Sequence, residues 1–130
     1  MARRARRGAN AIEFALLFPV FTWLMTGVID YGWLFTIRSV AAHAIHEGAR
    51  AGAVTLVKDD PAAVATSTLE DRLKRSGFSL STKISATVDG KPPDAYVQVE
   101  LYVELQPLVG LVPVPRSYTT TAVMRLEDQS

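Results

Sequence analysis

Cysteine is absent from all 130 residues of the chain. Its absence excludes a disulfide framework, a thiolate nucleophile and a cysteine-ligated metal site. An excess of charge is missing as well, since 14 lysines and arginines face 13 aspartates and glutamates, for a formal net charge of +1. This balance gives no indication of nucleic acid as a partner, because nucleic-acid binding requires a concentration of positive charge. The length allows one small domain, or a membrane segment followed by a small domain.

Charged residues are also scarce in one long stretch near the N-terminus. Between Ala11 and Ile37 only Glu13 and Asp30 carry a charge. At about 1.5 Å per residue, a helix of this length crosses a hydrocarbon core of about 30 Å. The stretch is too long for the apolar region of a cleaved secretory signal, and no small-x-small cleavage site ends it. We therefore predict a transmembrane helix over residues 9–37.

Positive charge is concentrated just before this helix, in a leader that we place at residues 1–8. The leader contains four arginines, Arg3, Arg4, Arg6 and Arg7. Under the positive-inside rule such a cluster stays on the cytoplasmic side of the membrane. The sequence therefore predicts a single-pass protein with a cytoplasmic N-terminus, in which residues 38–130 form a head on the other side.

Glu13 stands out because a carboxylate inside a lipid-spanning helix costs about 2.5–3.5 kcal/mol at the bilayer centre. Two interpretations are open. An acid at the start of a helix is stabilised by the positive end of the helix dipole, and this requires no further function. Alternatively, the carboxylate meets a positive partner that the isolated chain does not supply.

The predicted membrane helix contains further special positions. Pro19 removes one backbone donor and is expected to kink the helix. Gly27 and Gly32 would let another helix approach closely. Asp30 has two interpretations, a proton-relay or assembly acid and a marker of the outer membrane boundary. We favour the second, because the aromatic residues beside it suit the headgroup level. Since the following segment is rich in alanine, the best helix former, we predict that the helix continues to about Leu56.

The rest of the sequence has the periodicities of one helix and three strands. Asp60 and Pro61 fit the N-cap and the first position of a helix that ends near Gly77. Apolar and polar residues then alternate, as in strands with one buried face, over residues 78–88, 97–105 and 117–127. The second helix and the soluble half of the first can cover that face, which predicts an α+β head with a three-stranded antiparallel sheet.

The coil Pro107–Pro115, between the second and third predicted strands, is unusually apolar for a loop. Apolar surface of this kind is normally covered. We expect the coil either to pack on the head or to face a partner or the membrane surface.

Several short motifs resemble one protein family. The stretch Gly8-Ala9-Asn10-Ala11-Ile12-Glu13-Phe14 resembles the processing site of type IV prepilins, especially those of Flp/Tad systems. The wider set resembles the TadE-like pseudopilin family of tight-adherence (Tad) machines, at Arg7-Gly8, Ala11–Leu16, Pro19, Gly27, Asp30-Tyr31-Gly32 and Glu47–Ala51. Two positions differ from the family, which often has Glu where Asp30 stands and commonly Arg where Trp33 stands. The second difference leaves Asp30 without an adjacent cation.

The resemblance implies a structural role as a minor pilin or pseudopilin in a Flp-type (Tad) pilus that serves adhesion. A prepilin peptidase would cleave between Gly8 and Ala9, with Phe14 as part of its recognition. Glu13 would then neutralise the new N-terminal amine during assembly. The helix-packing positions implied are Pro19, Gly27, Asp30 and Gly32, and the family block comprises Glu47, Gly48 and Arg50.

The resemblance also implies partners and a location. The partners are other pilins and pseudopilins, the prepilin peptidase, the inner-membrane assembly platform and the lipid bilayer, with no nucleic acid among them. The location is the bacterial inner membrane, with the N-terminus cytoplasmic and the C-terminus periplasmic or extracellular. Whether the chain is incorporated in the pilus stays open.

Two other classes of function are open from the residues. One is an uncleaved single-pass protein whose head binds partners through Pro107–Pro115. The other is a substrate-binding or metal-dependent accessory protein of secretion, because His43, His46 and Glu47 lie along one side of a helix, although further ligands and the H-E-x-x-H order are missing. The simpler interpretation is a solvated face on which Glu47 contacts His43 or Arg50. Since no nucleophile–base pair, phosphate loop or cofactor motif occurs, we expect no enzyme, no cofactor and no metal.

Overall fold

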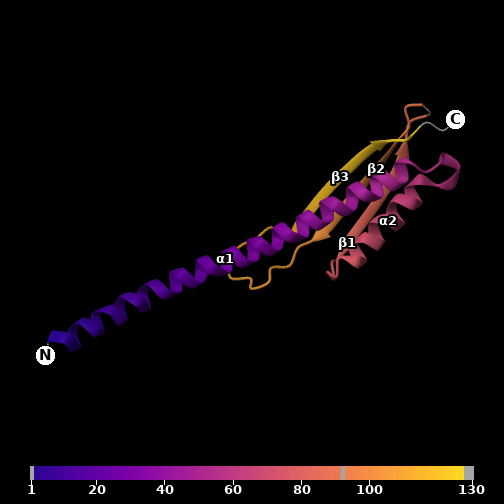
Figure 1. The fold of residues 1–130 in the computed structure, drawn as a ribbon. Coiled ribbons are helices and arrows are strands. Elements are labelled where there is room, and N and C mark those ends of the chain that lie inside the picture. The colour runs from indigo at the N-terminus through magenta and orange to yellow at the C-terminus, as the bar shows by residue number, and fades with distance from the viewer. Residues whose placement is uncertain (1, 92, 128–130) are drawn as a thin grey trace. The chain divides into compact units, whose positions relative to one another are not determined.

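The structure is a computed structural model that describes residues 2–91 and 93–127, without the side chains of residues 2–10 and 57. In chain order the elements are α1 (Ala2–Ala53), a 3₁₀ turn (Val57–Asp59), α2 (Pro61–Arg75), β1 (Thr82–Asp89), β2 (Tyr96–Glu104) and β3 (Ser117–Arg125) (Figure 1). A long helix, a second helix and an antiparallel sheet make the fold α+β, so the predicted fold class is confirmed.

The chain divides into two compact units, which are described separately. The helix–loop unit comprises Met1–Leu34 and Pro107–Val114, and the head comprises Phe35–Gln106 and Pro115–Ser130. Helix α1 contributes residues to both units. The apolar loop between β2 and β3 therefore belongs with the N-terminal part of α1.

Helix α1 is long and apolar enough to cross a membrane, and one such helix fits a single-pass membrane protein. The helix continues through Pro19. Two of its threonines are satisfied within the helix itself, because the Thr22 hydroxyl donates to the Phe18 carbonyl at 2.9 Å and the Thr26 hydroxyl donates to the Thr22 carbonyl at 2.6 Å. Polar groups satisfied within the helix are compatible with lipid.

The sheet of the head has the strand order β1-β2-β3, and both neighbouring pairs are antiparallel. The central strand has the clearest alternation, and its inward residues Val97, Val99, Leu101 and Val103 are fully buried. Helix α2 packs on β1 and β2 (Figure 1). A Cβ atom built on Gly52 of α1 would lie 3.4 Å from Cγ2 of Val97. Both helices thus cover the apolar face of the sheet, as the alternation predicted.

The two helices of the head approach each other closely where α1 has glycine. A Cβ atom built on Gly48 would lie 2.8 Å from the Ala65 carbonyl oxygen and 2.9 Å from the Leu69 Cβ. A Cβ on Gly52 would lie 2.8 Å from the Pro61 carbonyl oxygen. Gly48 and Gly52 are four residues apart, in a G-x-x-x-G pattern. The two helices can therefore approach closely at both positions, because only glycine leaves room for a neighbouring backbone.

Two predicted boundaries differ from the structure by more than two residues. Helix α1 ends at Ala53 and not near Leu56, because the Thr55 amide bonds to the Gly52 carbonyl at 3.1 Å and Leu56 is extended. The first strand begins at Thr82 and not at residue 78. Before it, the Leu80 amide donates to the Phe78 carbonyl at 3.1 Å, and this local turn occupies a donor that strand pairing would need.

The predicted N-cap of the second helix is expected to contribute measurably to the free energy of unfolding. Asp60 is the N-cap, its φ is 53°, and its side chain accepts a hydrogen bond from the Ala63 amide at 3.2 Å. The variant Asp60→Ala loses the acceptor and keeps the left-handed backbone, so it should lower the free energy of unfolding by about 1–2 kcal/mol. Urea unfolding of the full chain in detergent micelles, followed by circular dichroism, measures this loss. Asp60→Asn is the control and should stay near wild type, because asparagine caps helices and tolerates positive φ; equal losses in both variants would contradict the capping role.

Candidate functional site

Glu13 lies on the exposed surface of α1, among apolar side chains that are exposed as well. Ile12 and Phe14 flank it in the sequence, and the rings of Phe14 and Phe18 are 5.7 Å apart between centroids. Within the described part of the chain Glu13 forms no ion pair. Because Glu13 is exposed, its carboxylate is accessible to groups from outside the chain.

The predicted processing site precedes Glu13 by about one turn of helix. Gly8 and Ala9 belong to the helical span of α1, but they lie outside the residues whose side chains the structure describes. Cleavage between them stays a prediction, and so does the recognition role of Phe14.

Asp30 is the most deeply buried acid of the described residues, with 1% of its surface exposed. Its Oδ1 accepts hydrogen bonds from the backbone amides of Leu108 at 2.9 Å and Val109 at 2.8 Å. Its Oδ2 accepts from the Gly110 amide at 3.0 Å. Three amide donors thus surround the carboxylate, and hydrogen bonds to a charged acceptor are about twice as strong as neutral ones. They stabilise the anion where the sequence offers no adjacent cation.

The loop that Asp30 holds also contacts neighbouring positions of α1. The Tyr31 hydroxyl donates to the Pro113 carbonyl at 3.3 Å. A Cβ atom on Gly27 would lie 3.6 Å from Cγ2 of Val112, so this glycine faces the loop of its own chain. By contrast, Gly32 is exposed and has nothing within 4 Å of its Cβ position. Packing of these positions against another helix stays a prediction.

Sequence reasoning missed the partners of Asp30, namely the amides of Leu108, Val109 and Gly110. Two signals pointed toward them separately. One is an acid placed in an apolar helix, and the other is an apolar loop without charged residues. Neither signal says that the two meet, because 78 to 80 residues separate them in the sequence.

The family block lies in the head, at the contact between α1 and α2. Gly48 is buried against Ala65 and Leu69, whereas Arg50 is exposed. The expected contact of Glu47 with His43 or Arg50 is replaced by an ion pair with Arg72 of α2. The difference follows from the close approach of the helices, which brings α2 within reach of Glu47.

The candidate metal ligands do not gather into a site. His43 and His46 are exposed, and Glu47 is paired with Arg72. Among the described residues no group of three or more histidine, aspartate or glutamate side chains is arranged to hold a metal ion.

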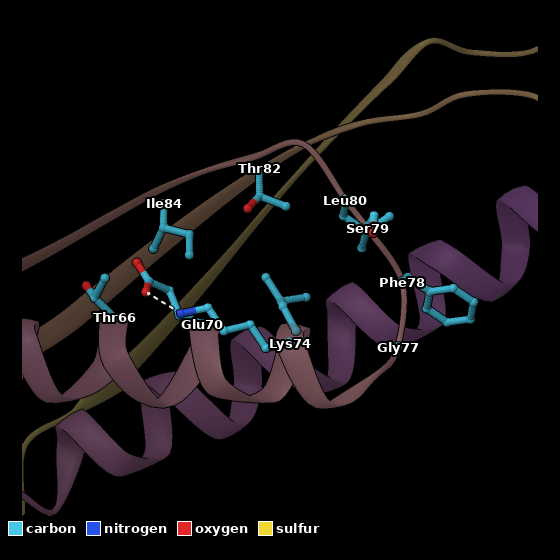
Figure 2. A pocket seen from close by; sticks show the side chains of 10 residues that line it. Thr66, Glu70, Lys74, Gly77, Phe78, Ser79, Leu80, Thr82 and Ile84 are labelled. Atoms are coloured by element: carbon cyan, nitrogen blue, oxygen red, sulfur yellow. Dashed lines mark ion pairs between the residues drawn. The ribbon is translucent and has the colours of Figure 1, made fainter.

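The head also has a hollow between α2 and the segment that leads into β1 (Figure 2). Glu70 and Lys74 of α2 line it and form an exposed ion pair of 3.6 Å. The opposite charges of the pair offset each other among the lining residues. The other side chains that line the hollow are apolar or carry only a hydroxyl: Thr66, Leu73, Phe78, Ser79, Leu80, Thr82 and Ile84.

Comparison with known proteins bears on the N-terminal segment. Searches of curated proteins and of solved structures gave no match. The model of the family described as TadE-like protein matches residues 8–50, which include Glu13, the Asp30 position and the block Glu47 to Arg50. The match confirms the resemblance found in the sequence, and it implies a protein associated with Tad pili. Residues 8–50 of the chain are therefore similar to the TadE-like family.

Proposed function

We propose that the chain is a minor pilin, or pseudopilin, which takes part in the assembly of a Flp-type Tad pilus for adhesion. The observation that carries the proposal is the TadE-like match over residues 8–50, which includes the processing motif and the acid at Glu13. The exposed apolar surface of α1 around Glu13 supports it, because such a surface suits lipid before assembly and other pilin helices after it.

The proposed orientation places the arginine leader in the cytoplasm and the head on the far side of the inner membrane. Four arginines precede Gly8, and positive charge of this kind is retained on the cytoplasmic side. A prepilin peptidase of the inner membrane then cleaves between Gly8 and Ala9. Cleavage removes the arginines and creates a single positive charge, the amine of Ala9.

The carboxylate of Glu13 links this cleavage to assembly, because it can pair with the amine that cleavage creates. Its carboxylate is unfavourable in lipid, and it has no cationic partner among the described residues. An amine liberated on a neighbouring subunit supplies the missing charge, and opposite charges attract strongly where water is excluded. Extraction from the bilayer is thereby coupled to docking beside other pilins and the assembly platform.

The N-terminal residue of the protein tests processing directly. When the full chain is produced together with a prepilin peptidase, N-terminal sequencing of the membrane fraction should begin at Ala9. The variant Gly8→Val places a branched side chain at the scissile bond, so its protein should keep the leader. A wild-type protein that begins at Met1 or Ala2 in the presence of active peptidase would contradict processing, and it would favour an uncleaved membrane protein with a binding head.

A further inference from the structure

The loop of the helix–loop unit leaves its apolar side chains without cover. Leu108, Val109 and Leu111 are all exposed. No charged residue occurs from Pro107 to Pro115. A contiguous apolar surface of this kind marks contact with a protein or with a membrane.

The position of the loop along α1 decides which surroundings it meets. Val112 joins Trp23, Leu24, Gly27, Val28 and Tyr31 in lining one apolar groove. A hydrocarbon core of about 30 Å takes about 20 helical residues, so a core that begins just after the leader extends to the neighbourhood of Asp30. The loop therefore lies beside the half of the span that is farther from the leader.

Part of the backbone of the loop is satisfied within the helix–loop unit. Pro107, Pro113 and Pro115 have no amide hydrogen. The amides of Leu108, Val109 and Gly110 all donate to Asp30. Irregular backbone exposed to lipid does not occur within the hydrocarbon core. Because Leu111, Val112 and Val114 carry further amides, the loop suits the partly hydrated headgroup level at the edge of that core.

We propose that the loop Pro107–Pro115 lies with its apolar side chains in the boundary between headgroups and acyl chains of the leaflet farther from the arginine leader, and that Asp30 holds it there against α1. The loop is continuous in space with exposed residues of the candidate membrane span, such as Trp23 and Val28, so the same surroundings cover both. The occupant of this surface is lipid. Asp30 accordingly lies within the membrane-embedded unit, where it accepts the hydrogen bonds of three loop amides.

The absence of cysteine makes the loop easy to probe with one label. The full chain carrying Leu111→Cys is spin-labelled and reconstituted alone in phosphatidylcholine–phosphatidylglycerol vesicles, and the accessibility of the label to oxygen and to a water-soluble nickel chelate is measured. Val123→Cys on β3 is the matched control, because Val123 is 57% exposed and Leu111 is 61% exposed. We expect the ratio of oxygen to nickel accessibility to be severalfold higher at position 111 than at position 123.

Each other outcome overturns the proposal. Equal accessibility to nickel at both positions would place the loop in water. Protection at position 111 in native membranes, but not in vesicles of lipid alone, would mean that a protein partner covers the loop. These outcomes are independent of N-terminal processing, which is read from the sequence of the mature protein.

A second variant tests the role of Asp30. Asp30→Asn keeps the shape but replaces one acceptor oxygen with a donor nitrogen, which would face a loop amide. The label at position 111 should become severalfold more accessible to nickel, while the label at position 123 stays unchanged and the protein still floats with the vesicles. An unchanged label at position 111 would show that Asp30 does not hold the loop in lipid.

Discussion

Replacement of Glu13 by glutamine is expected to leave the protein in the membrane and to remove it from pili. Glutamine has nearly the same shape as glutamate but carries no charge, so the helix enters lipid as well as wild type or better. At the docking step, however, the amine of Ala9 on the neighbouring subunit would remain unpaired. Loss of one partner from a buried pair costs about 3–5 kcal/mol. Because each 1.4 kcal/mol is a factor of ten, incorporation should fall on the order of a hundredfold or more.

The measurement compares the amount of variant in sheared pili with the amount in the inner-membrane fraction. Glu13→Asp is the matched control, since it keeps the charge on a side chain that is shorter by one methylene. It should retain most of the incorporation that Glu13→Gln loses. If both variants enter pili as wild type does, charge pairing at Glu13 has no part in assembly. If both remain outside the membrane, the effect lies in insertion, and the pairing mechanism is equally contradicted.

The elements of the fold were predictable where a single residue settles the local backbone. Asp60 and Pro61 start α2 as predicted, and Gly77, with a φ of +78°, follows its end. The alternation of β2 predicted its buried face residue by residue. By contrast, the start of β1 was placed too early, because apolar alternation does not reveal the turn at Phe78 that precedes the strand.

The candidate site was predictable only in part, because its groups meet through long-range contacts. The family resemblance identified Glu13 and the block at Gly48, and the structure adds the surroundings of each. The bonds between Asp30 and the loop join segments 78 to 80 residues apart, and no local periodicity fixes that register. Likewise, Glu47 has candidate partners on its own helix, but only the packing of α2 brings Arg72 to it.

Replacement of Gly48 by alanine is expected to destabilise the head strongly. Alanine normally favours a helix over glycine by about 1 kcal/mol. Here the new Cβ would lie 2.8 Å from the Ala65 carbonyl oxygen and 2.9 Å from the Leu69 Cβ, and neither atom is the end of a flexible side chain. Overpacking of this kind costs about 1–3 kcal/mol, so the clash should outweigh the gain in helix propensity. Gly48→Leu should cost still more, because it would force α1 and α2 apart.

Urea unfolding of the full chain in detergent micelles measures the effect on the head. Gly32→Ala is the matched control, because a Cβ there meets nothing within 4 Å, and it should leave the unfolding of the head unchanged. If Gly48→Ala unfolds no earlier than wild type, the close contact of the two helices does not exist in solution. A loss of stability in Gly48→Ala would mean that Gly48, which lies in the TadE-like segment, allows α2 to pack closely against α1. Its variants should then reduce pilus assembly through the amount of folded protein, whereas Glu13→Gln should reduce it with the head intact.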